Sequence, residues 1–361
     1  MAYLAGHFMG AALERSGSLE SGAQRAKMVV FGTSGDKHAG YFGNYLYFRL
    51  QQKSGELAKK MSEQTEKTDK KNLNRKKIGL ALGGGGAKGL AHIGVIKALQ
   101  QAEIPIDYIA GTSMGALVGG WYAAKKNILL LENLFLQIDH KSIFPVEKMV
   151  KTKDGSLFQN KTIVELLESG IGRTKIEDCQ IPFAAVATNV ANGDEVIIKE
   201  GKLSDAIRAS IALPVIFSPV KINDKLLMDG GLINPVPADI LKEMGAEIVI
   251  AVDVSSRWLT SYDIKGEPVN FKNFYSLVSD VFSVLEYQIA KKILKEADII
   301  LRPPVINYDW LDFHRAKGII EAGSGETKRN LEEIRKKTGY LKKEPETLFE
   351  KFINFLLYNE E

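Results

Sequence analysis

Two short apolar runs in this chain each lead into a glycine-containing turn and then into a helix-compatible stretch. Ile78–Leu82 leads into the glycines at 83–86, after which residues 90–101 have apolar side chains at helical spacing. Ile106–Ala110 leads in the same way into Gly-Thr-Ser-Met-Gly at 111–115. Strands that alternate with helices through short turns form parallel sheets with right-handed crossovers. The pattern predicts an α/β fold with a mostly parallel central sheet.

The chain divides into three parts. Residues 77–255 carry the alternation of strands and helices and form the predicted α/β domain. Residues 1–76 differ in composition, with aromatic side chains over 41–50 and a charged stretch after them. They predict an N-terminal extension that is an arm, a tag or a contact with a membrane or a partner. Residues 256–361 predict a mostly helical C-terminal extension packed on the α/β domain.

Net charge and cysteine content narrow the class of protein. A net charge of +4 over 361 residues is small, which argues against nucleic acid as a partner. The single cysteine, Cys179, excludes an internal disulfide framework and predicts a reducing compartment such as the cytoplasm. No apolar run reaches the ~18 residues that span a bilayer, and the N-terminus lacks a signal-peptide pattern. Peripheral membrane contact stays open, as does the oligomeric state, with a homodimer as one option.

Ser113 lies at the centre of the second glycine turn, where a strand is predicted to pass directly into a helix. A serine hydroxyl must be exposed beside a base to act as a nucleophile. A sharp strand-to-helix turn exposes it, and glycines two positions before and after it, Gly111 and Gly115, relieve the crowding of that turn. An ordinary helix cap is the alternative interpretation of the motif. We predict Ser113 as a candidate nucleophile.

The glycine run at 83–86 has three interpretations. A mononucleotide P-loop requires lysine followed by serine or threonine, but Gly89 follows Lys88. A dinucleotide site fits Gly84, Gly86 and Gly89 formally, although the next strand ends in Gly-Thr-Ser instead of an acidic residue. An oxyanion hole uses backbone N–H groups beside a helix N-terminus. Since this third interpretation also uses the serine, we favour it.

The general base is expected to be Asp229, which precedes Gly230 and Gly231. A carboxylate at the end of a strand, before a flexible turn, can approach an exposed hydroxyl, and burial should raise its pKa. A histidine base has less support, because of the five histidines only His314 follows Asp229, and it lies in a predicted helix without loop signals. His92 is expected to pack under the glycine loop.

Together these segments resemble the patatin-like phospholipase family. The similarity lies in the run 82–89, in Gly-Thr-Ser-Met-Gly-Ala at 111–116 and in Asp-Gly-Gly at 229–231. A further similar segment spans residues 209–217. The likeness covers about residues 77–254, is weaker beyond them and is absent from the N-terminal extension. The short spacing is more similar to the bacterial branch related to neuropathy target esterase than to the plant storage proteins.

The resemblance implies a three-layer α/β/α fold and lipid acyl hydrolysis by a Ser-Asp dyad, without a cofactor or a metal. It makes Ser113 the nucleophile and Asp229 its base. The residues that it assigns to the oxyanion hole are Gly84, Gly85 and Gly86, and those that support the motifs are Lys88, Gly89, Gly111, Gly115, Gly230 and Gly231. The implied substrates are phospholipids, lysophospholipids or other fatty acyl esters. Acyl transfer through the same acyl-enzyme and an inactive lipid-binding scaffold stay open as alternatives.

Overall fold

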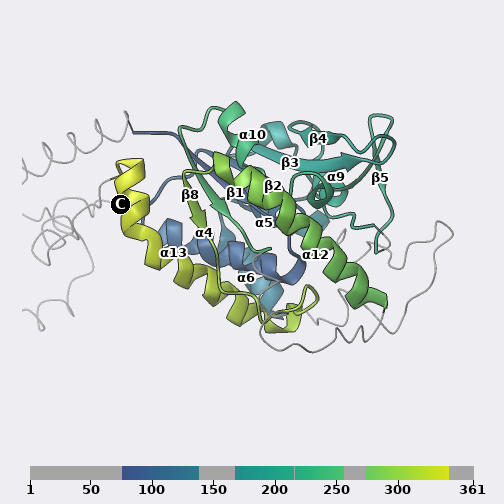
Figure 1. Cartoon of the computed structure of the whole chain (residues 1–361). Coiled ribbons are helices and arrows are strands. Elements are labelled where there is room, and N and C mark those ends of the chain that lie inside the picture. The colour runs from purple at the N-terminus through teal and green to yellow at the C-terminus, as the bar shows by residue number, and fades with distance from the viewer. Residues whose placement is uncertain (1–74, 138–166, 215, 256–273, 341–361) are drawn as a thin grey trace, which may run out of the picture. The chain divides into compact units, whose positions relative to one another are not determined.

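The computed structural model describes residues 75–137, 167–214, 216–255 and 274–340, all of which lie in one compact unit (Figure 1). Residues 1–74 of the predicted N-terminal extension, which include its aromatic stretch at 41–50, lie outside the described residues.

One sheet runs through the described residues. Its strands follow the order β5-β6-β3-β2-β1-β7-β8, and β4 also pairs with β3. Their bounds are β1 (Ile78–Leu82), β2 (Tyr108–Thr112), β3 (Phe183–Asn189), β4 (Glu195–Ile198), β5 (Val220–Ile222), β6 (Lys225–Asp229), β7 (Ile248–Val252) and β8 (Ile299–Leu301). Pairing is parallel through β3, β2, β1, β7 and β8, and antiparallel where β4, β5 and β6 join. The predicted α/β fold with a mostly parallel sheet is confirmed.

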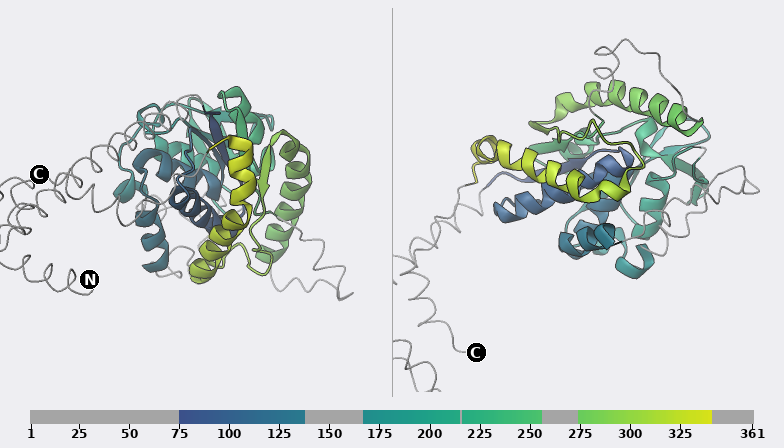
Figure 2. Two further views of the ribbon diagram at one scale, coloured as in Figure 1. Left: turned by 90° about the vertical axis from the view of Figure 1, so that its left-hand side faces the viewer. Right: turned by 90° about the horizontal axis from the view of Figure 1, so that it is seen from below.

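Helices cover both faces of the sheet, and each face has its own apolar core (Figures 1 and 2). Successive side chains of a strand point to opposite faces, so Leu80 and Leu82 enter one core and Ala81 the other. The first core is shared with α4 (Ala91–Gln101), α5 (Met114–Lys125), α6 (Ile128–Gln137), α9 (Leu203–Ser210) and α13 (Ala316–Thr338). The second is shared with α10 (Ala238–Glu243), α12 (Phe274–Ile293) and η5 (Leu294–Glu296). The predicted three-layer α/β/α architecture is therefore confirmed.

The described part of the C-terminal region completes the sheet and one of its helical layers. β8 pairs in parallel with β7, and α13 packs along α4. The two helices approach closely at Gly94 and Gly323, where an added Cβ would overlap the backbone of the other helix. The boundary between domain and extension at residue 255 stays a prediction.

Strand β2 shows why predicted and observed boundaries differ. The apolar run predicts a strand over Ile106–Ala110, whereas β2 ends at Thr112. Its last two residues, interpreted from the sequence as part of a turn, pair with Ala185 and Val186 of β3. The end of a strand depends on its pairing with a neighbouring strand, and the periodicity of apolar residues does not predict that pairing.

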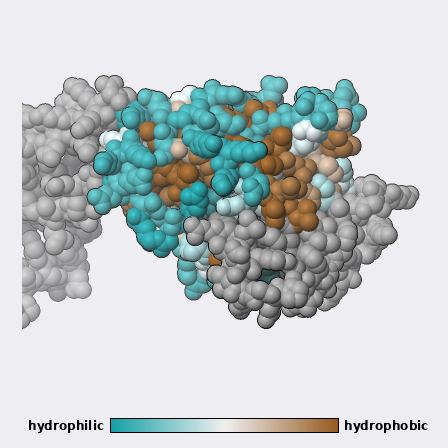
Figure 3. Space-filling view, viewed as in Figure 1, coloured by the Kyte–Doolittle hydropathy of each residue, from teal (hydrophilic) through white to brown (hydrophobic). Residues whose placement is uncertain are grey.

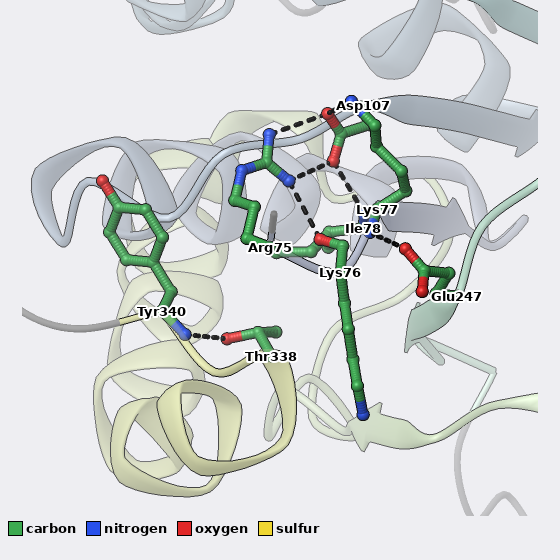
Figure 4. A network of polar contacts seen from close by, with 8 residues as sticks. All are labelled: Arg75, Lys76, Lys77, Ile78, Asp107, Glu247, Thr338 and Tyr340. Atoms are coloured by element: carbon green, nitrogen blue, oxygen red, sulfur yellow. Dashed lines mark hydrogen bonds and ion pairs between the residues drawn. The ribbon is translucent and has the colours of Figure 1, made fainter. Parts of the chain in front are cut away.

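An ion pair joins the amino-terminal ends of β1 and β2 (Figure 4). The Arg75 guanidinium donates to both carboxylate oxygens of Asp107, at 2.6 and 2.8 Å, and the Ile78 N–H donates to Asp107 Oδ2 at 2.7 Å. Burial by itself raises the pKa of Asp107, but the hydrogen bonds from Arg75 and Ile78 outweigh burial and hold this pKa below its ordinary value. Asp107 is therefore ionised in the folded protein near neutrality.

We expect Asp107→Asn to lower the free energy of unfolding by about 2 kcal/mol near neutral pH, because hydrogen bonds to a charged group are lost. Since the pKa of Asp107 is lowered on folding, its contribution is present above its unfolded pKa and disappears as pH falls through its folded pKa. Urea unfolding at several pH values measures both effects. Asp224→Asn is the matched control, because its pair with Lys221 is exposed and worth less than about 0.5 kcal/mol. Equal losses in both variants would contradict the prediction.

Candidate active site

Ser113 follows β2 directly and precedes α5, in a backbone conformation that side chains rarely adopt. Its φ and ψ are 54° and −122°, as a sharp strand-to-helix turn requires. A Cβ on Gly111 would lie 2.5 Å from the Gly115 carbonyl oxygen, and a Cβ on Gly115 would overlap the Leu82 carbonyl. The two glycines therefore let the backbone close around Ser113, whose side chain is half-buried.

Ser210, at the end of α9, stabilises this turn through its side chain. The Ser113 N–H donates to Ser210 Oγ at 2.9 Å, and Ser210 is fully buried. The hydroxyl of Thr112 donates to the Asn234 carbonyl at 2.7 Å. Two successive residues, the last of β2 and the first after it, are thus hydrogen-bonded to distant parts of the chain. The sequence places Ser210 only within a segment that resembles the family, and its bond to Ser113 has no local signal.

Folding brings Ser113 and Asp229 together. The Ser113 hydroxyl donates to Asp229 Oδ2 at 2.7 Å. Asp229 ends β6 and caps η4 (Gly230–Leu232), where its Oδ1 accepts the Gly231 N–H at 2.8 Å. The Thr188 hydroxyl donates to the Asp229 backbone carbonyl at 2.8 Å. Both carboxylate oxygens are therefore held, and Oδ2 faces the serine.

The two residues meet because β2 and β6 share one edge of β3. Val186 pairs with both β2 and β4, so these two strands lie on opposite edges of β3. Ala187 pairs with both β4 and β6, which places β6 on the same edge as β2. Along that edge Thr112 is opposite Val186, and Asp229 is opposite the next residue, Ala187. Ser113, the residue after β2, therefore lies beside the last residue of β6.

The environment of Asp229 makes its carboxylate a stronger base than a solvated one. Burial raises its pKa to about 7, while the hydrogen bonds from Gly231 and Ser113 act in the opposite direction. The residue is only 2% exposed, so desolvation of the charged form dominates. A solvated aspartate with a pKa of about 3.9 is a weak base near neutrality. The upward shift has the direction expected from the sequence and suits a general base.

The glycine loop between β1 and α4 lies beside Ser113, but one of its amides is already engaged. The Gly84 N–H donates to the Pro235 carbonyl at 2.9 Å, which contradicts the prediction that it serves an oxyanion hole. This amide anchors the loop instead. The N–H groups of Gly85 and Gly86 have no hydrogen-bond partner among the described residues. These two glycines are therefore the donors that the loop can offer.

The other predicted motif residues lie in the short helices that follow the glycine loop and β6. Lys88 and Gly89 lie in η1 (Gly86–Leu90), and Gly230 and Gly231 follow Asp229 in η4. A Cβ on Gly89 would lie 2.5 Å from the side chain of Met114, the first residue of α5. The absence of a side chain at Gly89 therefore lets η1 pack against the start of α5.

No imidazole hydrogen-bonds to Ser113 within the described residues. His92 is fully buried, and its Nε2–H donates to the Gly83 carbonyl at 2.7 Å. Burial lowers its pKa to about 4, so His92 is neutral and supports the glycine loop. His314 is exposed, on η6 (Phe313–Arg315). The other three histidines, His7, His38 and His140, lie outside the described residues. Over the same described ranges, no three His, Cys, Asp or Glu side chains gather into a metal-binding group.

Glu286 is a site residue that the sequence analysis missed. It lies on α12, within the region that the sequence predicts to be mostly helical, and it is 9% exposed. Its Oε1 occupies the space that a Cβ on Gly231 would take. The sequence signal is one acidic residue among apolar neighbours, and helical periodicity does not say what such a residue faces.

Comparison with known proteins identifies relatives of this chain. Residues 80–242 match the family model described as "Patatin-like phospholipase". "Lysophospholipase NTE1" of Scheffersomyces stipitis is 31% identical over 278 residues, covering 70% of this chain and 18% of that protein. "Neuropathy target esterase sws" of Drosophila melanogaster is 32% identical over 282 residues, covering 70% and 19%. An uncharacterized NTE family protein of Mycobacterium tuberculosis is 37% identical over 179 residues, covering 50% and 49%. The chain therefore spans from 18% to 49% of the length of these relatives.

Proposed function

Since residues 80–242 form a patatin-like phospholipase domain, we propose that this chain hydrolyses carboxylic esters of lipids, with Ser113 as nucleophile and Asp229 as its base. The observation that carries the proposal is the 2.7 Å hydrogen bond from the Ser113 hydroxyl to Asp229. The raised pKa of Asp229, about 7, supports the same roles, since it lets the carboxylate accept a proton near neutrality.

The proposed reaction has two steps. Ionised Asp229 takes the hydroxyl proton as Ser113 Oγ attacks the ester carbonyl carbon. The N–H groups of Gly85 and Gly86 hold the resulting oxyanion, and each such donor is worth about 3 kcal/mol in the transition state. The intermediate then expels the alcohol, which receives the proton from Asp229. In the second step Asp229 takes a proton from water as the water oxygen attacks the acyl carbonyl carbon. The bond between this carbon and Ser113 Oγ then breaks, Asp229 returns the proton to Ser113 Oγ, and the fatty acid leaves.

The proposed substrates are phospholipids, lysophospholipids or other fatty acyl esters. The names of two relatives, a lysophospholipase and an esterase, support this class. The test is hydrolysis of p-nitrophenyl esters of increasing acyl length and of a lysophospholipid, with and without an added alcohol acceptor. Release of free fatty acid supports hydrolysis, and acylation of the acceptor reveals acyl transfer. If neither free fatty acid nor acylated acceptor forms, and a fluorophosphonate does not label Ser113, the result favours an inactive lipid-binding scaffold.

The proposed setting is the cytoplasm, with peripheral contact between α12 and a lipid surface. Val281 and Leu285 lie about one helical turn apart on α12 and are 50% and 48% exposed. Figure 3 shows hydrophobic surface on the face of the molecule where α12 lies. Residues 1–76 are a second proposed contact. Of the helices that the structure describes, none has the length and apolar character needed to span a bilayer.

We expect the double substitution Val281→Ser and Leu285→Ser to weaken vesicle binding by about tenfold or more, because two apolar side chains no longer leave water on binding. Hydrolysis of a soluble short-chain ester should stay unchanged, because that reaction needs no lipid surface. Sedimentation with phospholipid vesicles measures the first effect. Val190→Ser, at a residue that is 43% exposed, is the control. Deletion of residues 1–74, which keeps the ion pair of Arg75 with Asp107, tests the second contact. Unaltered vesicle binding by the double variant would reject a role for α12.

A further inference from the structure

A second carboxyl group, that of Glu286, lies inside the candidate active site although the proposed mechanism does not use it. A Cβ on Gly84 would lie 3.2 Å from Glu286 Oε1 and 3.4 Å from the Cβ of Ser113. A Cβ on Gly231 would overlap the same oxygen. The carboxyl group of Glu286 therefore lies between the glycine loop and the turn after Asp229, next to the candidate nucleophile.

Charged groups from three elements act on Glu286. Burial is the main cause that raises its pKa, to about 8, and the negative charges of Asp229 on β6 and of Asp253 after β7 raise it further. The positive charge of Lys88 on η1 acts in the opposite direction. Glu286 thus carries its proton at neutral pH, when the neighbouring Asp229 begins to ionise.

The protonation state of Glu286 matters because an oxyanion develops beside it in the proposed reaction. An ionised carboxylate next to the glycine loop would repel that negative charge in a site of low dielectric constant. A neutral carboxylic acid has no such repulsion and can donate a hydrogen bond to an oxyanion. The loop itself offers only the amides of Gly85 and Gly86 among the described residues, since Gly84 is engaged by Pro235.

We propose that Glu286 is a further catalytic residue, which stabilises the oxyanion as a neutral carboxylic acid at the glycine loop. The inference rests on the proposed ester hydrolysis. The proton stays on Glu286 throughout, so the group acts by hydrogen bonding and by its lack of charge. Activity then requires ionised Asp229, which is present above about pH 7, and protonated Glu286, which is lost above about pH 8.

The test compares kcat/KM of the wild type with that of Glu286→Gln for a soluble p-nitrophenyl ester, from about pH 5 to about pH 10. The glutamine amide is neutral at every pH and still has a donor. We expect the wild type to lose about tenfold per pH unit on the alkaline side, and Glu286→Gln to keep a plateau there. Glu296→Gln, which removes an exposed carboxylate from η5, should retain the wild-type profile. The same alkaline decline in the wild type and Glu286→Gln would overturn the inference.

A second variant keeps the proposal testable if Glu286→Gln does not fold. Lys88→Gln removes the positive charge that lowers the pKa of Glu286, so the alkaline decline should move to higher pH. A decline that stays in place or moves to lower pH would overturn the inference. If the variants hydrolyse the ester with the same alkaline decline as the wild type, only the proposed role of Glu286 is rejected. A wild type that hydrolyses no ester at any pH rejects the proposed function, and the inference with it.

Discussion

Replacing Ser113 with alanine is expected to lower kcat for ester hydrolysis by about 10⁴-fold or more. The proposed reaction passes through an acyl ester of the Ser113 oxygen. Among the described residues, Ser113 is the only one whose hydroxyl donates to the Asp229 carboxylate, so no other hydroxyl can take its place. Steady-state hydrolysis of a short-chain p-nitrophenyl ester measures the loss. Intact-mass detection of fluorophosphonate labelling checks the same oxygen directly, since the label should disappear in Ser113→Ala.

Two further serine variants control this experiment. Ser324→Ala, in a half-buried position on α13, should retain wild-type activity. Ser210→Ala should lose about fivefold in activity, between the losses of Ser324→Ala and Ser113→Ala, because it removes one hydrogen bond of about 1 kcal/mol to the Ser113 backbone. If Ser113→Ala keeps more than about a hundredth of the wild-type activity, Ser113 is rejected as the nucleophile. Without the Ser113 oxygen, Asp229 acting as a general base cannot replace the covalent step.

Asp229→Asn is expected to lower kcat by about 10³-fold, because the amide cannot accept the serine proton. In the wild type the base form exists above the folded pKa of about 7, so activity should decline as pH falls through that value. The measurement is kcat/KM against pH on the acidic side. A wild-type rate that stays level down to about pH 4 would exclude Asp229 as the base, because a carboxyl with a raised pKa would be protonated there.

The same substitution should stabilise the fold at alkaline pH. Burial raises the pKa of Asp229 above its unfolded value, so the folded state binds the extra proton. The free energy of unfolding therefore falls as pH rises from the pKa of Asp229 in the unfolded state to its pKa in the folded state. The full loss of stability is reached above about pH 7. Asparagine carries no such cost, so Asp229→Asn should unfold at a higher temperature than the wild type above pH 7 and show no gain below about pH 4. Calorimetry at both pH values tests this, with the exposed Asp224→Asn as control. A lower unfolding temperature for Asp229→Asn at alkaline pH would indicate a structural role for the carboxylate.

Local features of the sequence predict the elements of the site but only part of its chemistry. The apolar run at Ile78–Leu82 is a strand with the same bounds in the structure, and Ser113 lies between a strand and a helix as the glycine spacing indicates. The engagement of the Gly84 amide has no such signal, because its acceptor is the carbonyl of Pro235, far along the chain. Glu286 enters the site through the docking of α12, which periodicity alone does not orient.

The sequence alone determined the α/β fold class, the strand-to-helix turn at Ser113 and the glycine loop, because apolar spacing and glycine positions act within a few residues. Tertiary structure decided that Asp229 meets Ser113, since this follows from β2 and β6 sharing one edge of β3. It also decided which loop amides are engaged and which second carboxyl lies beside them. The physical reason is that these contacts depend on pairing and burial between distant segments, and burial then sets the pKa of each carboxyl group.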